Sequence, residues 1–346
     1  MRRGLLLIMI LLILVLPVHA ADLEPPEVPE SAQPYMPEET ENFGEGLWYV
    51  IRSALRELEP QFVKAAKVCL SVIAVTLLTA LLLTIKGEIS EVVELTGAVS
   101  IGVLLLQPAN VLVQLGVETI SELSNYGNLL LPVMTTALAA QGGVTSSTAL
   151  YAGTALFNTV LSNLISHLLV PILYIFLCVS VGYAAVGDTI LEKIRKFSKW
   201  LITWSLKIIL YVFTGYMGLT GVVSGSTDAA ALKATKLTIS GVVPVVGGIL
   251  SDASEAILVG ASLVKNAVGV YGLLALIAIW IKPFVQIGVQ YLMLKGTAAI
   301  CAGIGSKRVC GIIDDFAAGM GLILAMTGTT CLLLLISIVC FLKGIL

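Results

Sequence analysis

The strongest constraint on the fold of this chain is its supply of long apolar runs, one of which covers residues 144–186 without a charged side chain. A helix needs about 20 mostly apolar residues to cross a bilayer. Charged residues make up only 12% of the 346 residues, about half the share found in a soluble domain. The runs are continuous rather than alternating, which argues against a β-barrel. The sequence therefore predicts an all-α, polytopic membrane helix bundle with about seven to nine spans.

One stretch departs from a simple membrane span. Residues 239–267 read ISGVVPVVGGILSDASEAILVGASLVKNA, in which a proline and paired glycines interrupt the first turns and charged residues follow. Irregular backbone and charge at membrane depth persist only where protein or a water-filled cavity shelters them. We predict a sheltered, interrupted helix that lines a conduit; the alternative is a loop or an internally paired segment. The candidate residues here are Pro244, Gly247, Gly248, Asp252, Glu255, Lys265 and Asn266.

The same layout occurs earlier in the chain, where Pro132 is a further candidate residue. Pro132 and Pro244 are each followed by another proline after 39 residues. At an offset of 112, residues 128–175 match residues 240–287 at ten of 48 positions. Apolar composition alone accounts for about half of these matches. The pattern indicates an internal repeat.

We interpret the chain as two related membrane halves, about residues 88–199 and 200–311, followed by a C-terminal span. In the first half, residues 129–140 are expected to form a half-helix or a re-entrant hairpin. An odd number of crossings in each half would invert the two copies. The basic loops at residues 193–199 and 307–308 occupy equivalent repeat positions, which favours parallel copies by the positive-inside rule. Both orientations stay open.

Three segments precede the predicted membrane domain of residues 61–346. Residues 1–20 have the basic start, apolar core and small-residue cleavage site of a secretory signal peptide, with an uncleaved first span as the alternative. Residues 21–42 are acidic and proline-rich, which predicts a flexible tether. Residues 43–60 place apolar side chains at helical spacing, which predicts an amphipathic interfacial helix. The mature N-terminus is therefore expected outside the cytoplasm.

The sequence also predicts where helices begin and end. Pro108 is expected to stop a helix, and a turn near residues 162–167 would divide the charge-free run into two crossings. Residues 187–199 are expected to form a basic loop helix ahead of a span that begins at Trp200. Asp314–Asp315 are expected to cap the last helix at its N-terminal end.

No catalytic constellation is present in the sequence. Residues 303–308 lack the ending of a phosphate-binding GxxxxGK[ST] loop, so ATP-driven work would need a partner. His167 beside Asn163 reads as a polar helix contact, and the six cysteines read as small hydrophobes. We predict no enzyme activity, no cofactor and no metal site. Weaker candidates for a polar lining are Glu94, Lys282, Gln286 and Gln290.

Two runs resemble a known family. They are ISGVVPVVGGILSDASEAILVGASLVKNAVGVYGLL and the later KPFVQIGVQYLMLKGTAAICAGIGSKR, and they resemble stage III sporulation protein AE of endospore-forming bacteria. The resemblance implies a component of the apparatus that joins the mother cell and the engulfed forespore, in the mother-cell-derived membrane round the forespore. It implies as partners a secretion-type ATPase (the AA protein), the ring-forming AG and AH proteins, and the forespore Q protein. It supplies no catalytic residues.

Three functions agree with these features. The leading hypothesis is an integral membrane subunit of a secretion-like channel complex, acting as conduit or assembly platform without its own ATPase. The main alternative is a secondary transporter or permease for a small solute or ion, and the third is a scaffold without a pore. Neutralising Asp252 or Glu255 should abolish uptake by a transporter, whereas a scaffold should depend on residues 43–58.

Overall fold

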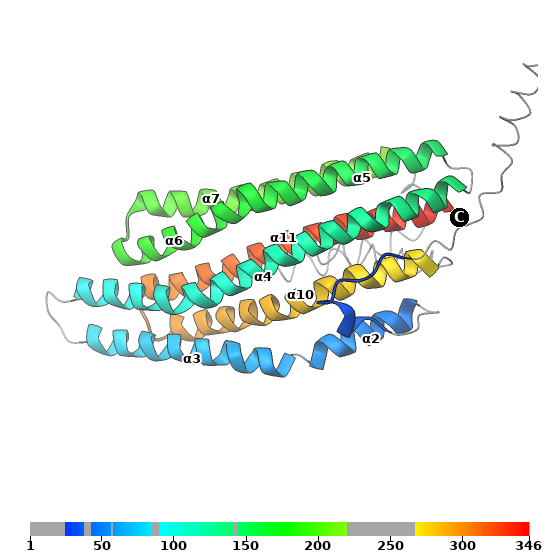
Figure 1. Ribbon diagram of the computed structural model, residues 1–346. Coiled ribbons are helices and arrows are strands. Elements are labelled where there is room, and N and C mark those ends of the chain that lie inside the picture. Colours follow the sequence, from blue (N-terminus) through cyan, green and yellow to red (C-terminus); the bar gives the residue numbers. More distant parts are fainter. Residues whose placement is uncertain are drawn as a thin grey trace, which may run out of the picture.

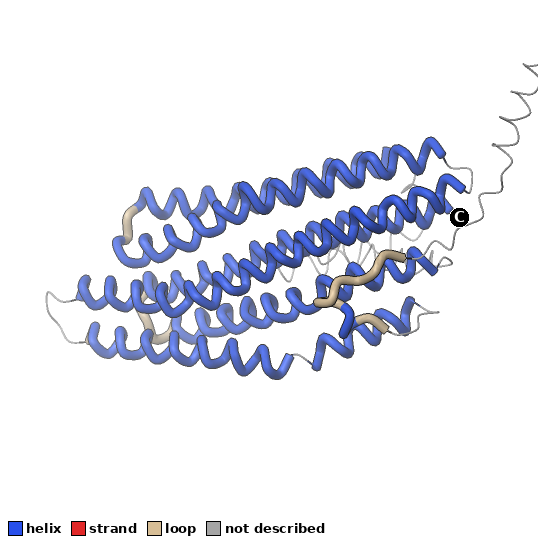
Figure 2. Tube along the Cα trace, viewed as in Figure 1, coloured by secondary structure: helices blue, strands red, loops and turns tan. Residues whose placement is uncertain are grey.

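The computed structural model describes residues 25–37, 43–56, 58–84, 90–140, 144–219 and 267–345. Over these residues the chain is almost entirely helical, as the all-α prediction requires. The long helices pack side by side and form one elongated bundle (Figure 1). The tube view shows the short loops that join them (Figure 2).

The elements in chain order are η1 (Gln33–Tyr35), α2 (Phe43–Arg56), α3 (Leu58–Leu83), α4 (Ser90–Ala140), α5 (Val144–Leu164), the π-helix η2 (Ile165–Leu169), α6 (Val170–Val186), α7 (Thr189–Leu219), α10 (Ala267–Ala302) and α11 (Lys307–Ile345). Within the described ranges, six helical runs are long and apolar enough to cross a membrane. Residues 220–266 lie outside those ranges. The total of seven to nine spans, like the internal repeat, stays a prediction.

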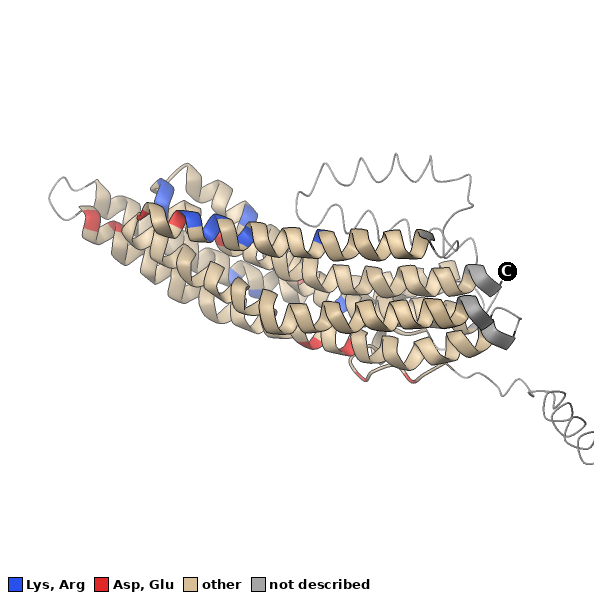
Figure 3. Ribbon diagram, turned by 90° about the horizontal axis from the view of Figure 1, so that it is seen from above, with Lys and Arg blue, Asp and Glu red and all other residues tan. Residues whose placement is uncertain are grey.

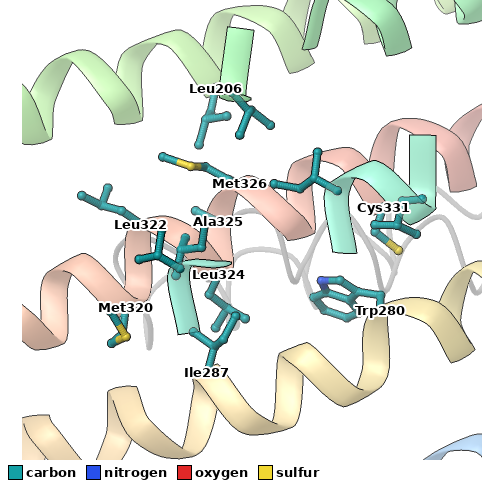
Figure 4. Close-up of a cluster of buried hydrophobic side chains, with 14 of the residues drawn as sticks. Leu206, Trp280, Ile287, Met320, Leu322, Leu324, Ala325, Met326 and Cys331 are labelled. Carbon is teal, nitrogen blue, oxygen red and sulfur yellow. The ribbon is translucent and has the colours of Figure 1, made fainter. Parts of the chain in front are cut away.

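Helix α11 lies at the centre of the bundle. It packs against α4 and α10 and also contacts α5, α6 and α7. From Phe316 to Leu342, every side chain except that of Ile336 is buried. A helix that is apolar on all sides is stable only when other elements cover it. Figure 4 shows this packing, with α11 side chains meeting Leu206 of α7 and Trp280 of α10.

Two glycines allow the close approach of α4 to α11. A Cβ atom on Gly116 would overlap the side chain of Ile323, and one on Gly127 would lie 2.6 Å from Cδ2 of Leu334. Small residues let membrane helices approach closely, because packing rather than hydrophobic burial holds such helices together in lipid. The contact between these two helices therefore depends on glycine at both positions.

Helix α4 differs from two predictions that were based on its prolines. Pro108 and Pro132 both lie inside this single helix of 51 residues. The predicted stop at Pro108 is therefore wrong, and so is the separate half-helix over residues 129–140. Proline removes one backbone donor and crowds the carbonyl four residues earlier, but neighbouring helices can hold a membrane helix together across it.

Polar contacts from neighbouring helices meet α4 near each of these prolines. The hydroxyl of Tyr174 in α6 donates to Oδ1 of Asn110 over 2.7 Å. The amide nitrogen of Asn158 in α5 donates to Oδ1 of Asn128 over 3.1 Å. Two tertiary hydrogen bonds thus fix α4 close to the points where its own hydrogen-bond ladder is interrupted.

The charge-free run of residues 144–186 forms one continuous helical path and not two crossings. Helix α5 continues through the π-helix η2 into α6, so the predicted turn near residues 162–167 is wrong. The π turn directly precedes Pro171 in the first turn of α6. The wider turn keeps the chain helical beside a residue that cannot donate a hydrogen bond. His167 Nδ1 lies 3.2 Å from the Asn163 carbonyl, the local contact that the sequence suggested.

The N-terminal residues lie against the bundle. Val28, Ala32 and Tyr35 are buried, and the Ser31 hydroxyl donates to Oε2 of Glu122 in α4 over 2.7 Å. Of the predicted flexible tether, residues 25–37 are therefore packed, because three apolar side chains in a short segment gain burial on the helices. Residues 1–24, with the predicted signal peptide, lie outside the described ranges.

Helix α2 covers residues 43–56 of the segment expected to form an amphipathic interfacial helix over residues 43–60, and residues 58–60 belong to α3. The interfacial position of the helix stays a prediction. Phe43, Val50 and Ala54 are buried on one face, and the helix packs against α10. Trp48 and Leu55 are 64% and 51% exposed on the opposite face. The buried face of α2 is thus covered by other helices of the same chain. The outer face of α2 stays available to a membrane interface or to another protein.

Candidate functional site: the charged end of the bundle

Most of the candidate residues named from the sequence lie outside the described ranges. Pro132 lies inside α4, as does the weaker candidate Glu94. The other weaker candidates lie in α10, and they are Lys282, Gln286 and Gln290. The interrupted helix and its lining stay predictions for Pro244, Gly247, Gly248, Asp252, Glu255, Lys265 and Asn266.

The described part of the chain has a different concentration of polar chemistry, at the end of the bundle where α6 turns into α7 and α10 turns into α11 (Figure 3). Arg308 of α11 lies against Gly187, in the turn between α6 and α7. Its guanidinium is 3.6 Å from the Glu94 carboxylate of α4. We call this region the charged end. Its bases are Lys193, Arg195, Lys196, Lys199, Lys295, Lys307 and Arg308.

The turn between α6 and α7 is built by two adjacent residues. Gly187 ends α6 with a φ of 76°, the left-handed conformation that glycine adopts without strain, and its N–H donates to the Tyr183 carbonyl over 2.8 Å. Asp188 then accepts a hydrogen bond of 2.7 Å from the backbone N–H of Ile190 and caps the start of α7. This tight reversal places the bases of α7 beside the start of α11.

A cluster of three side chains connects α6, α7 and α11, and we call it the clasp. Nη1 of Arg195 lies 2.5 Å from Oδ2 of Asp315, and the two side chains are only 17% and 15% exposed. The guanidinium also lies 4.5 Å from the ring centroid of Tyr183 in α6, close enough for a cation–π interaction. The clasp thus consists of Tyr183, Arg195 and Asp315.

The position of the clasp corrects the expected role of Asp314–Asp315. Helix α11 begins at Lys307, so these acids lie about two turns inside it and do not cap its first turn. Asp314 instead pairs with Lys295 of α10, with Nζ and Oδ1 2.5 Å apart. The two neighbouring acids therefore connect α11 to different helices.

The remaining ion pairs at this end are more exposed than the clasp. In the Lys295–Asp314 pair the side chains are 40% and 53% exposed, and Lys196 pairs with Glu192 one turn away on α7. Exposed pairs of this kind contribute about 0–1 kcal/mol each. The charged end thus combines one strong buried connection with several weak surface ones, an arrangement that fixes helices and presents a basic surface.

Sequence reasoning missed the clasp because its members are far apart in the chain, with 120 residues between Arg195 and Asp315. One feature of the sequence could have indicated such a contact: an ionisable residue within an apolar helix usually pairs with another group. Glu94 gave this signal and does pair, with Arg308. The basic residues 193–199 and 307–308 also lie at one end of the bundle. The separate loop helix expected over residues 187–199 is wrong, because α7 runs without a break from Thr189 to Leu219.

Five of the six cysteines are buried, and Cys178 is exposed. They form no disulfide, and Cys310 Sγ donates to the Cys301 carbonyl over 2.9 Å. Within the same ranges, no group of three or more His, Cys, Asp or Glu side chains could hold a metal ion.

Comparison with known proteins places this architecture in context. The family model described as Stage III sporulation protein AE matches residues 36–343. A curated relative, Stage III sporulation protein AE of Bacillus subtilis (strain 168), is 22% identical over 236 residues, which are 68% of this chain and 59% of the relative. The matched region thus spans less than two thirds of that relative. No solved structure matches the chain.

Proposed function

Because the chain belongs to the stage III sporulation protein AE family, we propose that it is a membrane subunit of a secretion-like complex joining mother cell and forespore, and that it acts as the assembly platform of this complex. In this proposal the AA protein supplies ATPase activity, and the AG, AH and Q proteins assemble with the platform. The membrane is the mother-cell-derived one round the forespore. The long apolar helices make the chain a multi-pass membrane protein.

The observation that carries the platform proposal is the burial of α11. A conduit through one copy of the chain needs polar side chains and water along its axis, but the axis of the described bundle is this tightly covered apolar helix. Its hydroxyl groups bond to carbonyls of the same helix, as Thr329 does to Ala325 and Ser337 to Leu333. The described bundle is therefore a packed body suited to holding partners.

A solute transporter is the alternative, and it would place a polar binding site near the middle of the membrane. The charges that would serve such a site, Asp252 and Glu255, belong to residues 220–266, outside the described ranges. Neutralising Asp252 and Glu255 should therefore abolish solute uptake by a transporter but leave an assembly platform intact. A conduit would likewise need that segment or several copies of the chain.

The distribution of bases also supports an orientation. Cytoplasmic loops of membrane proteins carry an excess of Lys and Arg, and residues 123–186, which include the last part of α4 and the start of α5 at the opposite end of the bundle, carry no charge. We propose that the charged end faces the mother-cell cytoplasm, and that residues 25–37 lie on the other side.

Thiol labelling tests this orientation. In a Cys178→Ser background, which removes the exposed cysteine, Ser31→Cys should react with a membrane-impermeant maleimide in intact, non-sporulating cells that express the protein, in which its non-cytoplasmic side faces the medium. Lys307→Cys should react only after lysis. Both parent residues are exposed. Labelling of Lys307→Cys in intact cells would reverse the orientation.

The outer face of α2 offers a direct test of the platform. Trp48→Ala, Arg52→Ala and Leu55→Ala together remove exposed side chains without touching the buried face. We expect recovery of the AA, AG, AH and Q proteins with tagged, full-length protein from sporulating cells to fall about fivefold or more, a loss of about 1 kcal/mol of binding free energy. The amount of the tagged protein should not change.

Two further variants complete this test. Leu70→Ala with Leu77→Ala alters exposed side chains of α3 and should leave the recovery of partners unchanged. Asp252→Asn with Glu255→Gln should also leave it unchanged if the chain is a platform. A complex that stays intact while these last changes abolish uptake of a solute would establish the transporter instead.

A further inference from the structure

The outer face of α7 carries an exposed aromatic ladder. Phe197, Trp200 and Trp204 are stacked along the helix, with ring centroids 5.8 Å and 5.5 Å apart. Their side chains are 58%, 52% and 49% exposed. Tryptophan in such a position is enriched at the level where a membrane meets water, since the ring is apolar and its N–H is polar.

Lysines lie directly before this ladder. Lys193 and Lys196 are exposed and precede Phe197 and Trp200 by three or four residues, so they share its helix face. Lys199 lies on the flank of the same turn and is partly exposed.

The nearby charges leave this face basic. Asp188 caps the helix and Glu192 pairs with Lys196. Arg195 points away from this face, into the clasp. Lys193 and Lys199 form no ion pair with the side chains that the structure describes, so positive charge remains on the surface.

We propose that this face binds the headgroup of an anionic phospholipid in the cytoplasmic leaflet. The lysines would contact the phosphate, and the aromatic rings would lie along the glycerol and upper acyl chain. Basic residues beside a membrane helix attract anionic lipid. The site consists of Lys193, Lys196, Phe197, Lys199, Trp200 and Trp204.

The order of side chains along α7 favours lipid over an acidic protein. Lys193 and Lys196 precede the ladder and Lys199 lies between its first two rings, whereas the exposed aliphatic side chains of Ile208 and Val212 follow it. This is the order of headgroup, interface and hydrocarbon in one leaflet. Ile190 and Ile194 are also exposed, next to the first bases. Lys207 interrupts the apolar part, but its long stem can return the ammonium toward the headgroup layer. The proposal concerns the membrane, so it does not depend on the platform function.

Quenching of tryptophan fluorescence tests the site. The full-length protein is placed in nanodiscs that contain either brominated phosphatidylglycerol or brominated phosphatidylcholine at the same fraction. The same measurement is made on a double variant, Trp200→Phe with Trp204→Phe. The difference in quenching between the parent protein and this variant is the signal from the ladder. We expect the anionic lipid to quench this signal at least twofold more than the zwitterionic lipid.

Variants of the lysines test whether their charge causes the preference for anionic lipid. Lys193→Gln, Lys196→Gln and Lys199→Gln together should make the two lipids equal, and the corresponding arginine variant should keep the preference. Lys64→Gln with Lys67→Gln, exposed bases on α3, should keep it too. Equal quenching in the parent protein, a preference that survives the glutamine changes, or a ladder that neither lipid quenches would each overturn the proposal. The last result would show that protein covers this face.

Discussion

Replacing Asp315 with alanine should lower the free energy of unfolding by about 3 kcal/mol, the low end of the range for breaking a buried ion pair. The change leaves the Arg195 guanidinium without its carboxylate in a setting where only 17% of its side chain is exposed. It also removes the clasp contact between α11 and α7, because the remaining clasp contact joins Arg195 to Tyr183 in α6.

Buried thiols provide the measurement. Five cysteines are buried and Cys178 is exposed, so a Cys178→Ser background should react with a maleimide dye chiefly when the protein unfolds. Unfolding in graded denaturing detergent, followed by this reaction, gives the free energy. The buried cysteines are Cys69, Cys301, Cys310, Cys331 and Cys340.

The neighbouring acid is the matched control for the clasp. Asp314→Ala removes an exposed ion pair with Lys295 and should cost less than about 1 kcal/mol. Replacing both members of the buried pair, with Arg195→Met and Asp315→Leu, should recover much of the loss, because apolar side chains of similar size often substitute well for a buried pair. Equal costs for Asp314→Ala and Asp315→Ala would show that the clasp is not the stronger connection.

Truncating Trp280 should have the largest effect of any single change in the core. The indole is 8% exposed, its ring centroid lies 4.5 Å from that of Phe284, and its N–H donates to Oγ1 of Thr327 over 3.2 Å. Trp280→Ala should cost about 3–5 kcal/mol in the same thiol assay, through lost burial and the cavity that remains.

Two milder changes separate the contribution of the buried ring from that of its hydrogen bond. Trp280→Phe keeps an aromatic ring but loses the hydrogen bond and part of the volume, so its cost should lie between those of the parent and Trp280→Ala. Thr327→Val removes the acceptor and leaves the indole N–H unpaired, at about 1–3 kcal/mol. Trp204→Ala, at a tryptophan that is 49% exposed, should cost far less. If it matched Trp280→Ala, burial would not explain the result.

The elements that the sequence predicted well are those whose signal is local. The amphipathic pattern of α2 follows from its own residues, and the structure buries Phe43, Val50 and Ala54 together. The all-α architecture follows from the length of the apolar runs. Both properties can be read from a short window of residues, because burial repeats at the helical period.

The proline predictions failed for a tertiary reason. Pro108 was expected to stop a helix and Pro132 to lie in a separate half-helix or re-entrant hairpin, yet α4 continues through both. A proline breaks a helix when nothing else holds the two parts in line, and here α5 and α6 donate hydrogen bonds to Asn128 and Asn110. These partners lie 30 and 64 residues away in the sequence, so the window around each proline contained no sign of them.

The charged end was predictable only in part. The basic residues 193–199 and 307–308 indicated a common side, and the structure brings these parts of α7 and α11 to one end of the bundle. Which base meets which acid depends on how α7 and α11 are rotated about their axes, and charge counts do not carry that information. The Asp252 and Glu255 hypothesis concerns residues outside the described ranges and awaits its own test.

The length of α4 has a consequence for where this protein meets its surroundings. Its 51 residues extend about 75 Å at 1.5 Å per residue, whereas the hydrocarbon layer is about 30 Å thick. Even at a tilt of about 40°, the steepest usual for such helices, that layer holds only about 26 of these residues. Close to half of the helix therefore lies outside the hydrocarbon layer, where water and other proteins can reach this part of the bundle.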